Sequence, residues 1–150
     1  MDKPLIVQTI QLALTPVFML VAIGNIMNIL STRLARIVDR SRVLRQLHPE
    51  TSGPDHDELV RELRLVARRI HLIGRAILWL VIAGLCVGLT VVLLFIEDFA
   101  GIDMKPIVGT TFILAVALLI GALLLFLRET REATAALRIP ETFLELERRL

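Results

Sequence analysis

Three long apolar runs constrain the fold of this chain more than any other feature of its sequence. They occupy residues 5–30, 76–96 and 107–127 and contain no charged side chain. At 1.5 Å per residue in a helix, each is long enough to cross the roughly 30 Å hydrocarbon layer of a bilayer. A spanning run must be helical, because hydrocarbon cannot satisfy open backbone hydrogen bonds. The sequence therefore predicts an all-α integral membrane protein with three transmembrane helices, forming one domain over residues 1–150.

The distribution of arginine predicts how the chain is threaded. All fifteen arginines lie in residues 31–75 and 128–150, whereas the two lysines, Lys3 and Lys105, lie elsewhere. Short basic segments beside membrane spans stay on the cytoplasmic side. We therefore expect residues 31–75 and the tail 128–150 in the cytoplasm. The N-terminus and a short acidic loop over residues 97–105 are expected outside.

The segment between the first two spans, residues 31–75, shows the pattern of a helical hairpin. Apolar positions alternate spacings of four and three on both sides of a proline- and glycine-containing turn near residues 48–55. Such spacing is typical of packed helices and predicts a cytoplasmic antiparallel coiled-coil hairpin. Asp55 and Glu58 resemble a capping box that begins its second helix. The seam residues are Leu30, Leu34, Ile37, Ser41 and Leu44, then Leu59, Leu63, Val66, Ile70, Ile73 and Ile77.

The first span is unusually polar, and all its polar residues except Thr9 share one face. Gln8, Gln11, Thr15, Asn25 and Asn28 fall, with Thr32, within less than half the helix circumference. Amides that face lipid are costly, so this stripe must face protein or water. Three explanations stay open: packing between helices, a water-filled pore in an oligomer, or a contact site for a membrane partner.

A pore would need several copies, since three spans cannot enclose water. Its lining candidates include Phe18 and Ala22 as an apolar gate between polar layers. The full set is Gln8, Gln11, Thr15, Phe18, Ala22, Asn25 and Thr32.

Two further groups are candidates for other roles. Glu97, Asp98 and Asp103 would form an acidic ring at the outer mouth of such a pore, or otherwise a solvated loop. Small residues spaced by four favour close helix packing. They are Gly84 and Gly88 in the second span, and Ala117 and Gly121 in the third.

Catalytic and cofactor motifs are missing from the sequence. It contains no GxSxG, no HExxH and no glycine-rich phosphate loop. Cys86 is the one cysteine, so it can form no disulfide within the chain. The arginines alternate with acids and leucines without aromatic neighbours, which argues against nucleic-acid binding. We therefore expect no enzyme, no cofactor and no metal site. The expected partners are the lipid bilayer, further copies of the chain, or another membrane protein.

Residues 5–44 carry a family resemblance in the sequence LIVQTIQLALTPVFMLVAIGNIMNILSTRLARIVDRSRVL. They resemble a family of small three-span bacterial inner-membrane proteins catalogued only as a domain of unknown function. The resemblance implies a bacterial inner membrane and adds no activity. The layout is also similar to the proton-channel subunits that drive biopolymer transport and outer-membrane energisation. Together these features favour a homo-oligomeric channel lined by the first helix, with a non-conducting scaffold or assembly subunit as the alternative.

The predicted threading can be tested with single cysteines at Thr51 and Asp98 in a Cys86→Ala background. An impermeant thiol reagent added to intact cells should label position 98 and leave position 51 unlabelled, because position 51 lies in the arginine-rich segment. Membrane permeabilisation should then expose position 51. Labelling of position 51 in intact cells would reverse the whole threading.

Overall fold

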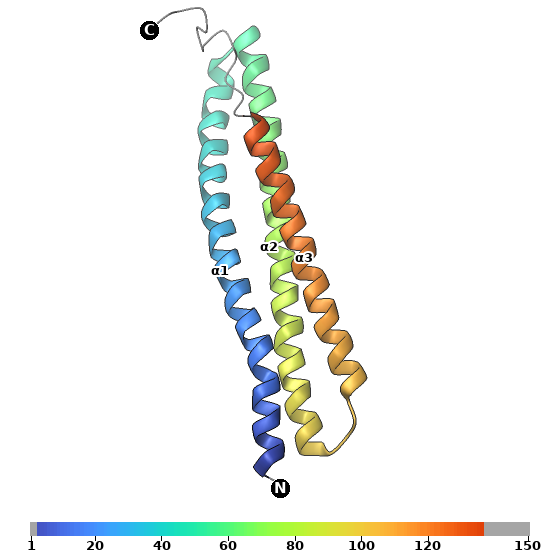
Figure 1. The fold of residues 1–150 in the computed structure, drawn as a ribbon. Coiled ribbons are helices and arrows are strands. Elements are labelled where there is room, and N and C mark those ends of the chain that lie inside the picture. Colours follow the sequence, from blue (N-terminus) through green and yellow to red (C-terminus); the bar gives the residue numbers. More distant parts are fainter. Residues whose placement is uncertain (1–2, 137–150) are drawn as a thin grey trace, which may run out of the picture.

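A computed structural model describes residues 3–136, which form three long helices lying side by side in an elongated bundle (Figure 1). They are α1 (Lys3–Leu47), α2 (Pro54–Ala100) and α3 (Lys105–Ala136), with a short 3₁₀-helix η1 (His48–Glu50) between α1 and α2. No strand occurs within these residues. Each long helix contains a segment long and apolar enough to cross a membrane. The predicted all-α, three-span fold is confirmed.

The hairpin seam is confirmed by the packing of α1 on α2. Leu30, Ile37 and Leu44 of α1 are buried with Leu59 and Val66 of α2 in one apolar core. In both helices the core positions recur every seven residues, the period of left-handed coiled coils. The same period continues into the spans, through Ile23 of α1 and through Ile73, Leu80 and Val87 of α2. One seam thus joins the hairpin and the first two spans.

The turn between α1 and α2 depends on a glycine and a proline. Gly53 has φ 69° and ψ −142°, a conformation that only glycine adopts readily, and Pro54 occupies the first turn of α2. The predicted capping box is wrong, because Gly53 is the N-cap and no side chain caps this helix. Asp55 lies inside the first turn instead, where its charge favours the helix dipole.

The connection between α2 and α3 is shorter than the predicted loop over residues 97–105. α2 continues to Ala100, and Gly101 ends it in the left-handed conformation at φ 66°. The Gly101 N–H donates to the Glu97 carbonyl oxygen at 3.0 Å, a typical glycine C-cap. Glu97 and Asp98 therefore lie on the last turns of a helix. At its C-terminal end, α3 includes residues 128–136 of the predicted tail. The rest of the tail lies outside the described residues.

Among the four small residues singled out above, Gly121 has the closest neighbour. A Cβ atom at Gly121 would collide with the indole ring of Trp79, so the absence of a side chain lets α3 approach α2. A Cβ at Gly84 would make ordinary contacts, at 3.9 Å, with Leu20 and Ile23 of α1. A Cβ at Gly88 would meet no atom within 4 Å, and Ala117 is exposed.

This difference between the glycines generates a prediction. Gly121→Ala should destabilise the protein by about 1–3 kcal/mol through overpacking against Trp79. Gly88→Ala is the matched control and should be neutral or stabilising, because alanine favours helix more than glycine and the space is open. Thermal unfolding in mild detergent measures both. Adding Trp79→Leu should recover part of the loss in Gly121→Ala, and equal stability of the two single variants would show that the ring is not a barrier.

Candidate functional site

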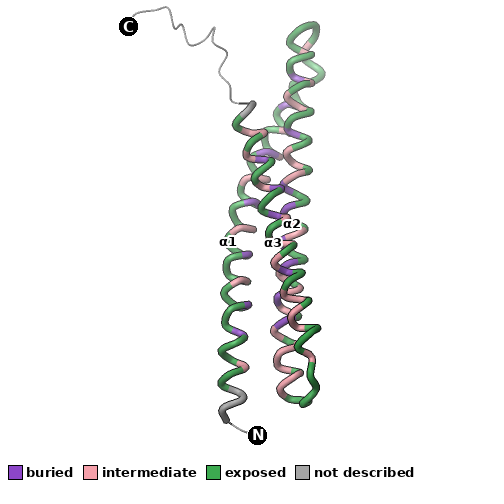
Figure 2. Tube along the Cα trace, turned by 45° about the vertical axis from the view of Figure 1, so that its right-hand side comes forward, coloured by how far each residue is buried: buried purple, intermediate pink, exposed green. Residues whose placement is uncertain are grey.

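All the predicted pore-lining residues are exposed on the isolated chain. They lie on the faces of α1 that point away from α2, whereas Ala13, Pro16 and Ile23 are buried. Figure 2 shows the buried positions of α1 along its side toward α2 and exposed positions elsewhere. The exposed candidates are Gln8, Gln11, Thr15, Phe18, Ala22, Asn25 and Thr32. Packing within one chain therefore does not cover the stripe.

These residues form a second heptad pattern, which the sequence reasoning above did not recognise. Two rows of α1 repeat every seven residues, and together they alternate spacings of three and four. This is the spacing by which one helix packs against a parallel copy of itself. We call these positions the outer seam of α1. Its rows are Gln8, Thr15, Ala22 and Ile29, and then Gln11, Phe18, Asn25 and Thr32.

The three candidate outer-mouth acids lie together at the loop end of the bundle. Glu97, Asp98 and Asp103 line an open depression of about 740 Å³, and Gln8 of α1 lines the same depression. Glu97 and Asp98 are half-buried and Asp103 is exposed. The Lys105 backbone N–H donates to the Asp103 carboxylate at 3.3 Å. The acids and the first residue of the outer seam thus share one end of the molecule.

A buried ion cluster joins all three helices at the arginine-rich end. The Glu129 side chain of α3 is 0% exposed, yet both of its oxygens accept hydrogen bonds. Arg33 of α1 donates to Oε2 at 3.0 Å, and Arg69 of α2 donates to Oε1 through Nε at 3.0 Å and through a terminal nitrogen at 2.9 Å. Arg33 also donates to the Thr130 hydroxyl at 3.1 Å and lies 5.1 Å from the centre of the Phe126 ring. A carboxylate this deeply buried requires such pairing.

Weaker ion pairs surround this cluster. Arg68 of α2 pairs with Glu132 of α3 at 2.9 Å. Arg40 of α1 donates to both oxygens of Glu62 of α2, at 2.8 and 3.0 Å. The hydrogen bond to Glu62 and its negative charge raise the pKa of the Arg40 guanidinium above its ordinary value. The Arg40–Glu62 pair is well exposed, so it adds little stability.

The sequence analysis missed Glu129, although one signal pointed to it. Glu129 follows Ala115 and Ala122 at steps of seven residues, and both alanines are buried. An acid that continues a buried row, just past a span, is expected to have a cationic partner. Its partners Arg33 and Arg69 lie 96 and 60 residues away in sequence, and spacing does not reveal pairs at such distances.

The fold and the position of its charges define a small membrane protein with three transmembrane helices. The chain belongs to the family described as "Protein of unknown function (DUF2721)", whose sequence pattern matches residues 13–139. The resemblance found from residues 5–44 is thereby confirmed. A search of curated proteins and a search of solved structures each gave no match. The family supplies no activity, so function must be argued from the side chains.

The buried cluster generates a stability prediction. Glu129→Gln removes the charge that two arginines share and should cost about 2–3 kcal/mol. Glu132→Gln is the matched control on the same helix. It loses one ion pair to an arginine whose side chain is 69% exposed and should cost less than about 1 kcal/mol. Thermal unfolding in mild detergent compares the two, and equal losses would contradict a structural role specific to Glu129.

Proposed function

We propose that this protein is a homo-oligomeric channel of the bacterial inner membrane, with a pore lined by the outer seam of α1. One observation carries the proposal: the polar side chains of the outer seam are exposed on the isolated chain and point away from α2. Exposure of these amides to hydrocarbon would cost considerable free energy, because lipid tails cannot form hydrogen bonds with them. Water in a central pore, or the same amides of neighbouring copies, would satisfy them.

Symmetry makes further copies of the chain suitable neighbours. Copies in one membrane share one orientation, so their α1 helices run parallel around an axis. Each layer of the ring then contains the same residue from every copy. Asparagine and glutamine both donate and accept hydrogen bonds, so the Gln11 and Asn25 layers can bond to themselves or to pore water. Parallel helices with heptad spacing pack in this way.

The packing of α1 on α2 is consistent with this arrangement. α2 covers the opposite face of α1, so a ring with the outer seam at its centre would leave α2 and α3 on the outside. Both helices expose large apolar side chains suited to lipid, among them Leu85 and Ile113. In such a ring Phe18 and Ala22 form an apolar constriction between the Thr15 and Asn25 layers, a known means of gating.

The outer seam is uncharged from Gln8 to Thr32, which favours weak ion selectivity. Glu97 and Asp98 at the loop end would raise the local cation concentration near the entrance. The arginine-rich end is proposed to lie in the cytoplasm, with the N-terminus outside, as the positive-inside rule requires.

A scaffold is the alternative function. The same exposed amides would also fit a helix of another membrane protein, and the protein would then assemble a complex without conducting. The two functions differ in what a seam substitution changes: conductance in a channel, and association in a scaffold.

Substitution of Asn25 tests the channel. Asn25→Leu should lower ion flux in reconstituted bilayers and leave the oligomer intact, because it replaces a polar pore layer by an apolar one. Val21→Leu is the control, since Val21 is also exposed, lies off both heptad rows and is already apolar. It should leave flux unchanged.

Two results would contradict the channel. Bilayers that contain an intact, correctly oriented oligomer and show no ion conductance at any applied voltage or membrane tension would favour the scaffold. A monomer in mild detergent that also resists cross-linking through Phe18→Cys in a Cys86→Ala background would exclude the ring.

A further inference from the structure

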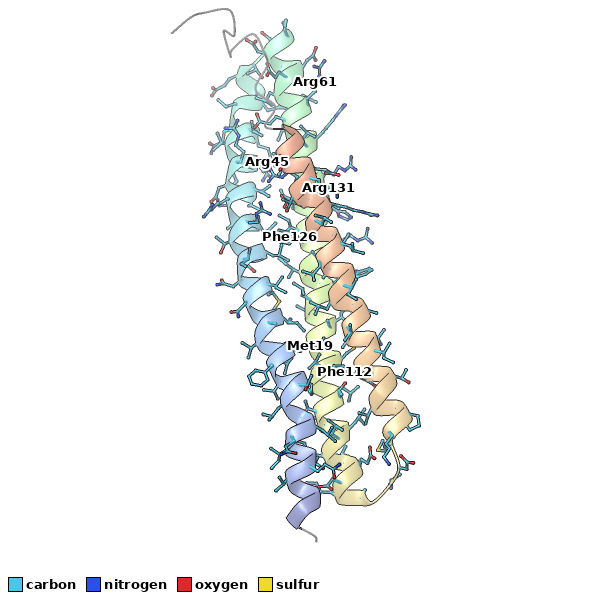
Figure 3. All side chains as sticks on the ribbon, in the orientation of Figure 1. Met19, Arg45, Arg61, Phe112, Phe126 and Arg131 are labelled. Carbon is cyan, nitrogen blue, oxygen red and sulfur yellow. The ribbon has the colours of Figure 1, made fainter. Side chains whose placement is uncertain are left out.

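Two exposed arginines lie beside the contact between α2 and α3 at the edge of the membrane-spanning segments. Arg75 directly precedes the apolar segment of α2, and Arg128 directly follows that of α3. Neither has an ion pair or a hydrogen-bonded side chain among residues 3–136. In Figure 3 the nitrogen-tipped side chains gather in the half of the bundle that holds Arg45, Arg61 and Arg131.

The helix repeat places Arg75 and Arg128 on facing rows. Arg68, Arg75 and Trp79 follow one another at steps of seven and four, so they share one face of α2. On α3, Gly121, Arg128 and Glu132 are spaced by seven and four and share a face for the same reason.

Two contacts bring these rows together. Arg68 pairs with Glu132 at 2.9 Å, and the Trp79 ring packs on Gly121. The contacts are eleven residues apart on both helices, so the antiparallel rows stay in register between them. Arg75 and Arg128 both lie in this interval. Each is a long side chain that can extend across the contact between the two helices.

The two arginines are on a flank of the α2–α3 pair that α1 does not cover. Arg33 of α1 contacts Phe126, Glu129 and Thr130, which lie on a different face of α3 from Arg128. On α2, Gly84 faces Leu20 and Ile23 of α1 and lies on nearly the opposite side from Arg75. In the membrane, lipid therefore reaches this flank directly.

We propose that Arg75 and Arg128 bind the phosphate of an anionic phospholipid. Guanidinium groups donate paired N–H bonds to phosphate oxygens, and long side chains at span ends reach the head-group level. The contrast with Arg68 supports the assignment. Arg68 lies on the same row of α2 as Arg75 and is neutralised by Glu132, whereas Arg75 and Arg128 are not neutralised by an acid. Trp79 lies one turn deeper, at the depth that indoles prefer near the interface.

A small exposed residue of α3 lies on the membrane side of the two arginines. Ala117 is exposed and lies one turn from Gly121, toward the membrane interior. An acyl chain below a phosphate held by Arg75 and Arg128 would lie over Ala117. Charge complementarity thus selects the head group.

Lipid retention by the purified full-length protein tests the site. Native mass spectrometry would compare binding of phosphatidylglycerol and phosphatidylcholine. The double variant Arg75→Gln, Arg128→Gln should weaken phosphatidylglycerol binding about thirtyfold and leave phosphatidylcholine unchanged. The double variant Arg61→Gln, Arg64→Gln is the control, with the same loss of charge at exposed positions of α2 farther from the membrane. It should bind phosphatidylglycerol like the wild type.

Three outcomes would overturn the proposal. Phosphatidylglycerol binding that is unchanged in the first variant would show that these arginines do not hold it. An equal loss in both variants would show general attraction to a basic protein rather than a site. If inorganic phosphate stabilised the protein against thermal unfolding as much as phosphatidylglycerol does, the arginines would bind free phosphate rather than a lipid. None of these measurements depends on ion conduction.

Discussion

The inability of hydrocarbon to satisfy polar groups is the constraint on which the rest of this structure depends. It requires each span to be helical and moves the charges to the helix ends. No charged residue lies between Lys3 and Arg33 of α1, and α2 and α3 are equally free of charge within their spans. The amides of α1 are the exception. They are costly in lipid and unnecessary for the packing of α1 on α2, which makes them the best evidence for what surrounds the protein.

α2 organises the bundle because it packs against both other helices. Its heptad row meets α1 along the hairpin and the span, and Trp79 meets α3 at Gly121. Direct hydrogen bonding between α1 and α3 in the described residues comes from Arg33, which reaches Glu129 and Thr130. The Glu129 cluster therefore sets the position of α1 relative to α3 at one end of the bundle. A channel that changed the tilt of α1 would have to break or move this contact.

Heptad spacing made much of the fold predictable from the sequence. Leu30, Ile37 and Leu44 are apolar at regular steps, and such local periodicity gives both the helix and its buried face. The predicted loop over residues 97–105 was too long, and the capping box at Asp55 was wrong. In both cases a glycine with positive φ determined the boundary, at Gly101 and Gly53. Hydropathy does not register such backbone preferences.

The candidate sites were less predictable because they depend on distant pairs. The sequence located the polar stripe of α1, yet it could not tell whether α2 or α3 would cover it. It also could not show which arginines would be neutralised. Arg33 and Arg69 meet Glu129 only because two turns bring the three helices together, and Arg75 is left unpaired by the same geometry.

The outer seam also indicates where contact between copies would end. Its heptad rows continue past Thr32 to Arg36 and Asp39, both exposed on α1. In a parallel ring each layer repeats one residue, so an Arg36 layer would bring like charges together and repel. Arg36 of one copy could instead pair with Asp39 of the next, because the two lie less than one helical turn apart. In water such a pair is weak, as the 3.5 Å contact of Asp39 with Arg42 in the same exposed setting illustrates. The proposed ring would therefore be held mainly by its uncharged layers within the membrane, and the hairpins beyond Thr32 would be free to separate.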